Sequence, residues 1–214
     1  MQLYSDKGLL NDYQKSSNHL KKAYYMYRPH PYFGGFYPGK ILSLIEDVDT
    51  FSKYFSESYR IKLAIKYFPN GLSPHGLSVL LNYQEYDIAF SEPITEIIFE
   101  LVWQLHFPNA LSRMACLYAS ESIESARPWK ELFLHNSDDP SGVSTESLWE
   151  IAYKGTAQSY DARYLSIMSQ GNFSYLTALD YAYKYWQGSR SENPLPELLV
   201  PYPVTIVQCV DSFL

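Results

Sequence analysis

The sequence has few cysteines, few basic residues and no long apolar run, and each shortage excludes a class of protein. Two cysteines in 214 residues, Cys116 and Cys209, are too few for a disulfide framework and lack metal-ligand spacing, which is typical of a reducing compartment. The net charge of -6 argues against generic nucleic-acid binding, because such proteins usually present a basic face. Without an apolar run of about 18 residues or a secretory signal pattern, we expect a cytoplasmic protein with no membrane contact, signal-independent export remaining open.

Familiar catalytic motifs are missing as well. The five histidines show neither HExxH nor another paired-ligand spacing, and no G-x-S-x-G occurs, so we predict no metal site and no serine hydrolase. Residues 34–40, GGFYPGK, have the letters of a phosphate-binding loop, but Ile41 stands where that loop needs Ser or Thr to hold magnesium. We interpret the segment as an aromatic surface loop.

Tyrosine is the residue present in excess, with 21 Tyr beside 11 Phe and 4 Trp. Because tyrosine joins an apolar ring to a polar tip, such a surplus suits stacking pockets and half-buried surfaces, although many tyrosines simply complete a core. The chain length and the hydrophobic content of 46% indicate a folded protein, which we predict to be a single domain over residues 1–214.

The spacing of apolar residues predicts an α+β protein, helical in its first half and with its sheet mostly in the second. We expect strands at 23–28, 114–119, 148–153, 197–200 and 204–210, and the last two are joined by a tight turn. Helices are expected at 49–68, 93–105, 122–133 and 174–186.

The predicted helix 93–105 carries two contrasting faces. One face is an apolar stripe that we expect in the core, formed by Ile94, Ile97, Ile98, Leu101, Val102 and Leu105. The opposite face holds acidic and amide side chains at a spacing of four, namely Glu92, Glu96, Glu100 and Gln104. We interpret this second face as solvated, which is a commoner cause of such a pattern than a carboxylate site.

Residues 107–129, FPNALSRMACLYASESIESARPW, resemble the strand-to-helix element of the ADP-ribosyltransferase superfamily. In that superfamily the strand supplies a Tyr that stacks on nicotinamide or a Ser-x-Ser that orders the active site, here Tyr118 or Ser120 with Ser122. The segment is also similar to NAD-degrading toxins of that fold. It is similar again to a bacterial family related to these transferases, in which Phe-Pro and Ser-Arg, ending here at Arg113, precede the strand.

Two further positions extend the resemblance. AYYMYR ends in Arg28, where such enzymes place an Arg or His that grips the dinucleotide, and a guanidinium suits a diphosphate because it stays charged and donates two hydrogen bonds. PELLVP supplies Glu197, matching the Glu at the start of a late strand. Cleaving the nicotinamide–ribose bond generates an oxocarbenium-like sugar, which a nearby carboxylate stabilises.

The resemblance implies a fold and a set of roles. The fold would be an ADP-ribosyltransferase-like split β-sheet core, from residues 23–40 and 107–214, with a helical insertion at 41–106. The catalytic residues would be Glu197, Tyr118 and Ser120, and the cofactor-binding residues would be Arg28, Tyr118, Ser122 and Arg113.

The implied function is an NAD-consuming enzyme of bacterial conflict or of a mobile element. It would cleave the nicotinamide–ribose bond of NAD, its substrate, and pass ADP-ribose to a protein, a nucleic acid or water. Because Leu195 stands where arginine-modifying members carry the first Glu of Glu-x-Glu, arginine is disfavoured as the acceptor.

A non-catalytic interaction protein is the alternative hypothesis. Its acidic, tyrosine-rich surface would hold a partner such as an antitoxin or an inhibitor. In that case Arg28 makes a surface ion pair, Tyr118 belongs to the core, and Glu197 is a strand-edge charge that discourages aggregation.

Overall fold

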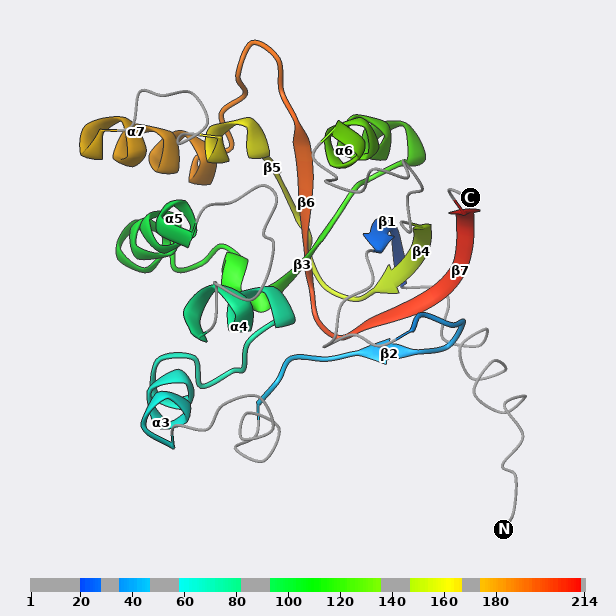
Figure 1. Ribbon diagram of the computed structural model, residues 1–214, viewed down its shortest axis with the longest axis horizontal. Helices are drawn as coiled ribbons and strands as arrows, with labels where there is room; N and C mark the ends of the chain where they lie inside the picture. Colours follow the sequence, from blue (N-terminus) through cyan, green and yellow to red (C-terminus); the bar gives the residue numbers. More distant parts are fainter. Residues whose placement is uncertain are drawn as a thin grey trace.

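A computed structural model describes residues 20–27, 35–46, 58–81, 93–135, 147–166 and 174–212 of the chain. These residues form an α+β protein, as the sequence predicts (Figure 1). The strands are β1 (Lys21–Tyr27), β2 (Ile41–Leu42), β3 (Cys116–Ala119), β4 (Ser147–Tyr153), β5 (Gln158–Asp161), β6 (Pro196–Pro201) and β7 (Val204–Ser212). The α-helices are α3 (Ser58–Tyr67), α4 (Pro74–Leu81), α5 (Pro93–His106), α6 (Ile123–His135) and α7 (Tyr175–Trp186).

The strands form two antiparallel sheets. One has the order β1-β4-β7-β2 and the other the order β3-β6-β5. The two sheets are joined where Tyr24 of β1 and Ser120, directly after β3, exchange backbone hydrogen bonds of 2.8 Å in both directions. The end of β3 is therefore fixed to both sheets.

The three-stranded sheet is covered on both faces because side chains alternate along each strand. Leu198 and Val200 of β6 pack with Ile151 and Ile206 of the four-stranded sheet. Leu199, between them in sequence, joins a second core cluster with helices α5 and α7. The result is three layers, with the helical layer and the four-stranded sheet on opposite sides of β6 (Figure 1).

A third cluster packs α3 and α4 around Met114. Ser73 directly precedes α4, and its backbone N–H and hydroxyl both donate to the carbonyl of Met114, at 2.8 and 3.0 Å. A Cβ atom at Gly76 would lie 2.2 Å from that same carbonyl, so the close approach requires glycine. These contacts anchor the helical first half to the segment that precedes β3.

Most predicted elements are confirmed. The predicted short connection between the last two strands, Tyr202 and Pro203, carries the chain from one sheet to the other, so β6 and β7 do not pair with each other. The predicted strand 114–119 begins two residues late, because Ser112 accepts a hydrogen bond from the backbone N–H of Met114 and starts a 3-10 turn, Arg113–Ala115. The beginning of the predicted helix 49–68 lies outside the described residues.

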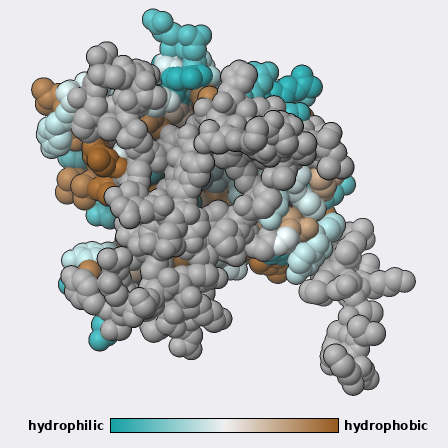
Figure 2. Space-filling model, in the orientation of Figure 1, coloured by the Kyte–Doolittle hydropathy of each residue, from teal (hydrophilic) through white to brown (hydrophobic). Residues whose placement is uncertain are grey.

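The orientation of α5 reverses the prediction. The side chains of Glu96 and Glu100 are buried, whereas four members of the predicted core stripe are exposed: Ile94, Ile97, Leu101 and Leu105. Apolar side chains gather on the side of the molecule that carries α5 and α7 (Figure 2). The prediction that this acidic face is solvated was wrong, because Arg113 and Ser112 lie beneath the helix and bind these carboxylates.

Length and hydropathy rule out a membrane-crossing helix within the part of the chain that the structure describes.

Candidate functional site

A surface cleft of about 370 Å³ opens beside α6, where β3 and β5 end and β6 begins. Its volume is in the range of small-molecule sites. The lining combines hydroxyl and charged side chains with prolines and one leucine: Ser120, Glu121, Ser125, Ser159, Arg190, Pro194, Pro196, Glu197 and Leu198. The residues come from three elements (α6, β5 and β6) and from two connecting segments, one between β3 and α6 and one between α7 and β6, so the cleft is a product of the tertiary fold.

The register of β3 and β6 brings two predicted site residues to this cleft. Ala119 is paired with Leu198, which places Ser120 and Glu197 at the next step of the same antiparallel ladder. The indole N–H of Trp129 in α6 donates to the carbonyl of Pro196 at 2.8 Å and so fixes the helix against the start of β6.

Ser122 has a structural role at the start of α6. Its hydroxyl accepts from the backbone N–H of Ser125 at 3.1 Å, and the hydroxyl of Ser125 accepts from the backbone N–H of Ser122 at 3.0 Å. This reciprocal arrangement resembles a capping box, which satisfies helix N–H groups that lack intrahelical partners. The cleft lining includes Ser125 but not Ser122.

Arg190 is a cleft residue that the sequence did not reveal. Its guanidinium donates to the hydroxyl of Ser159 at 3.0 Å. The loop that carries it is held by the buried carboxylate of Asp161, which accepts from the backbone N–H groups of Ser191 and Leu195 at 2.7 and 2.8 Å. Burial opposes ionisation of Asp161, but these hydrogen bonds lower its pKa and keep it an acceptor.

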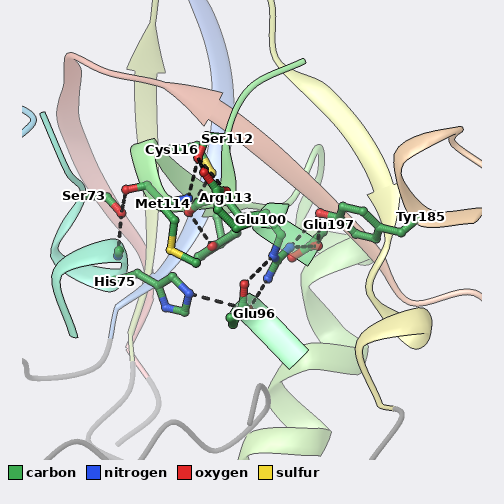
Figure 3. Close-up of polar contacts among 12 residues, drawn as sticks. Ser73, His75, Glu96, Glu100, Ser112, Arg113, Met114, Cys116, Tyr185 and Glu197 are labelled. Atoms are coloured by element: carbon green, nitrogen blue, oxygen red, sulfur yellow. Dashed lines mark hydrogen bonds and ion pairs between the residues drawn. The ribbon is translucent and has the colours of Figure 1, made fainter. Parts of the chain in front are cut away.

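A buried ionic network lies on the helical face of the same sheet (Figure 3). Arg113 donates through Nε and Nη2 to the two oxygens of Glu96, at 2.8 Å each. Through Nη1 it donates to Oε1 of Glu197 and to the hydroxyl of Tyr185, and that hydroxyl donates to the same Oε1 at 2.6 Å. Glu197 therefore belongs both to the cleft and to this network.

The charges of the network stabilise one another. Burial opposes the ionised form of Glu96, yet the Arg113 charge and hydrogen bonds outweigh it and lower the pKa of Glu96 well below the usual range. Burial also opposes the charge on Arg113, but Glu197 and Glu96 raise its pKa and keep it cationic. Burial raises the pKa of Tyr185, so its hydroxyl remains a donor.

Tyr118 packs against this network. Its ring lies 4.6 Å from the guanidinium carbon of Arg113 and 4.8 Å from the ring of His75, measured to ring centroids. Its hydroxyl donates to the backbone carbonyl of Arg113 at 2.7 Å. Tyr118 is not among the residues that line the cleft. In the described geometry its ring packs against Arg113 and His75 instead.

The predicted site residues thus separate into two groups that share Glu197. Ser120 and Glu197 line the cleft, while Arg113, Tyr118 and Glu197 meet in the buried network. The role predicted for Arg28 cannot be related to either group, because that residue lies outside the described part of the chain.

Sequence reasoning missed Glu96 and Tyr185 as well as Arg190. A signal for Glu96 was present, since Glu96 and Glu100 occur one helical turn apart on a largely apolar helix, but it was interpreted as solvated. In the described residues, His, Cys, Asp and Glu side chains form no group of three that could hold a metal ion.

Comparison with known proteins identifies the family. Residues 23–212 match the family model DUF2441, described as a protein of unknown function, and the chain belongs to that family. No curated protein matches the chain. The matched range includes all seven strands of the two sheets except the first two residues of β1.

Proposed function

We propose that the protein is an ADP-ribosyltransferase-like enzyme that cleaves the nicotinamide–ribose bond of NAD. The observation that carries the proposal is the meeting of Ser120 and Glu197 in one cleft, although 76 residues (197 − 121) lie between them in sequence. A hydroxyl and a carboxylate at the ends of paired strands are the groups that the resemblance assigns to this reaction.

The distribution of charge in the cleft supports a ligand that carries both signs. Arg190 supplies a cation beside Ser159, which suits a diphosphate. Glu121 and Glu197 supply negative charge beside Ser120, which suits the cationic nicotinamide ring and the oxocarbenium-like sugar that cleavage generates. NAD combines these features in one molecule.

The finer fold assignment belongs to the same proposal. Two antiparallel sheets joined at Tyr24 and Ser120 support a split ADP-ribosyltransferase-like core, with α3, α4 and α5 as the helical insertion. The acceptor of ADP-ribose would be a protein, a nucleic acid or water, in the cytoplasm and in a setting of bacterial conflict.

The proposal predicts that the purified protein releases nicotinamide from NAD. Arg190→Ala should raise the KM for NAD about tenfold, because a charge-assisted hydrogen bond to a phosphate contributes on the order of 1.5–3 kcal/mol. Arg127→Ala, which removes an exposed arginine from α6, is the matched control and should leave KM unchanged. Free nicotinamide is followed by chromatography over a range of NAD concentrations.

Two results would overturn the proposal. One is the absence of nicotinamide release with protein, nucleic acid or water as acceptor, together with no shift of the melting temperature in the presence of NAD. The other is release that responds equally to Arg190→Ala and Arg127→Ala, because the cleft would then not hold the dinucleotide.

A binding protein without catalytic activity is the second candidate, favoured by the exposed apolar side chains of α5. Ile94, Ile97, Leu101 and Leu105 recur at helical spacing and lie on the surface of the described residues. Such a stripe is typical of a face that packs on a partner, for example an antitoxin or an inhibitor. Nicotinamide release decides between this candidate and the enzyme.

A further inference from the structure

The buried network contains more negative than positive charge. Arg113, Glu96 and Glu197 are 3%, 0% and 4% exposed, and one guanidinium faces two carboxylates. Retaining an uncompensated charge in an interior is costly, because desolvation is offset only when a partner is present. The second carboxylate therefore needs either a further positive charge beside it or a function that explains why its charge is retained.

Arg113 binds its two carboxylate partners in different ways. Glu96 receives two donors, Nε and Nη2, in the planar bidentate arrangement that is strongest for arginine. Glu197 receives the remaining edge, Nη1, at a single oxygen, which it shares with the Tyr185 hydroxyl. Of the three hydrogen bonds that Arg113 donates to carboxylates, Glu96 thus receives two and Glu197 receives one.

Within the described part of the chain, the other titratable groups around the network place no second positive charge against Glu197. His75 lies against Glu96, with 3.6 Å between its Nε2 and Oε1. Glu100 adds a further acid on α5, although burial raises its pKa to about 7. Tyr185 and Tyr118 remain protonated, since burial raises the pKa of both.

We infer that Glu197 is held as a surplus anion for the cleft, with Glu96 as the positioning residue that neutralises Arg113. The ligand class that completes the charge balance is then a cation, or a molecule that becomes cationic as it reacts. This assignment rests on the proposed function, in which the departing nicotinamide leaves an oxocarbenium-like ribose. Glu197 acts on that charge through a water-poor interior, where electrostatic interactions are stronger than in water.

Two substitutions, each of which replaces a carboxylate with an uncharged amide, distinguish this role from a purely structural one. Glu197→Gln keeps an oxygen that can accept from Arg113 and Tyr185 while it removes the surplus charge, so the melting temperature should stay the same or rise. Glu96→Gln places an amide N–H₂ against a guanidinium N–H, leaves a buried donor without an acceptor, and should lower the melting temperature. Both melting temperatures are measured in the same buffer as that of the wild type.

Turnover supplies the second arm of the test. Glu96→Gln directs the charge of Arg113 to Glu197 alone, so kcat for nicotinamide release should fall at least about tenfold while KM for NAD stays constant. A merely structural Glu96 would reduce the folded fraction but leave kcat per folded molecule unchanged.

The two arms distinguish the possible failures. If Glu197→Gln lowers the melting temperature as much as Glu96→Gln, the charge of Glu197 is needed by the fold and the inference is overturned. If wild type releases no nicotinamide, the proposed function fails, while the pair of melting temperatures still decides whether Glu197 is a surplus anion.

Discussion

Glu100 shows how a single buried side chain ties the stability of this protein to pH. Its carboxylate accepts from the hydroxyl of Ser112, with 2.9 and 3.0 Å to its two oxygens, and is buried beneath α5. Burial raises its pKa to about 7 from an ordinary value of 4.5, although hydrogen bonds from Ser112 and Gln104 oppose the shift. The folded protein therefore binds a proton that the unfolded chain releases.

The sign of the resulting pH dependence follows from that difference in proton binding. The stabilisation is fully present below the unfolded value of 4.5 and is lost as pH rises to about 7. Glu100→Gln, which is always neutral, should flatten the free energy of unfolding over this window. It should stabilise the protein at about pH 8 by on the order of 3 kcal/mol.

Urea unfolding from about pH 4.5 to 8 measures this effect. Glu96 and Asp161 have lowered pKa values and act in the opposite direction below their ordinary range, so the difference between variant and wild type isolates Glu100. Glu131→Gln, at an exposed position of α6, is the control and should leave the slope unchanged. Parallel curves for Glu100→Gln and wild type would show that Glu100 is ionised in the folded state.

At the scale of elements, α5 has its polar groups buried and part of its apolar stripe exposed. Leu101 is 53% exposed, whereas its neighbour on the other face, Phe99, is fully buried against Tyr185 and Trp186. The helix is held by aromatic packing on one side and by Arg113 and Ser112 on another. Its exposed stripe adds little to the fold.

A matched pair of substitutions checks this orientation. Phe99→Ala should cost about 3–5 kcal/mol of unfolding free energy, since it removes a large buried ring. Leu101→Ser should change that free energy by no more than about 0.5 kcal/mol, as is usual on a surface. Denaturant titration measures both, and comparable losses would place Leu101 in a packed interface and restore the orientation expected from the sequence.

The elements themselves were largely predictable from the sequence, but their partners were not. Apolar spacing located α7 and alternation located β4, because these signals are local. The face of α5 depends on Arg113, which lies 17 residues from Glu96. No helical periodicity can reveal a buried cation supplied by another segment, so glutamates on that helix looked solvated.

At the scale of the whole molecule, the pairing of the strands determines which site residues meet, and the sequence did not predict that pairing. Strands β6 and β7 are neighbours in sequence and are joined by only two residues, yet each is central in a different sheet. That arrangement brings β6 between β3 and β5, and so places Ser120 and Glu197 in one cleft, which Arg190 also lines. Sequence motifs suggested Ser120 and Glu197 as site residues. They did not suggest Arg190, because Arg190 reaches the cleft only through the fold of its loop.

The most direct test of the central claim, that the charge of Glu197 at the cleft drives NAD cleavage, is the rate of nicotinamide release by wild type and Glu197→Gln. We expect wild type to release nicotinamide and the variant to be at least about 100-fold slower, with an equal or higher melting temperature, because an electrostatic contribution of this kind is typically worth 10²–10³ in rate. Equal rates in the two proteins, or no release by wild type, would contradict the account.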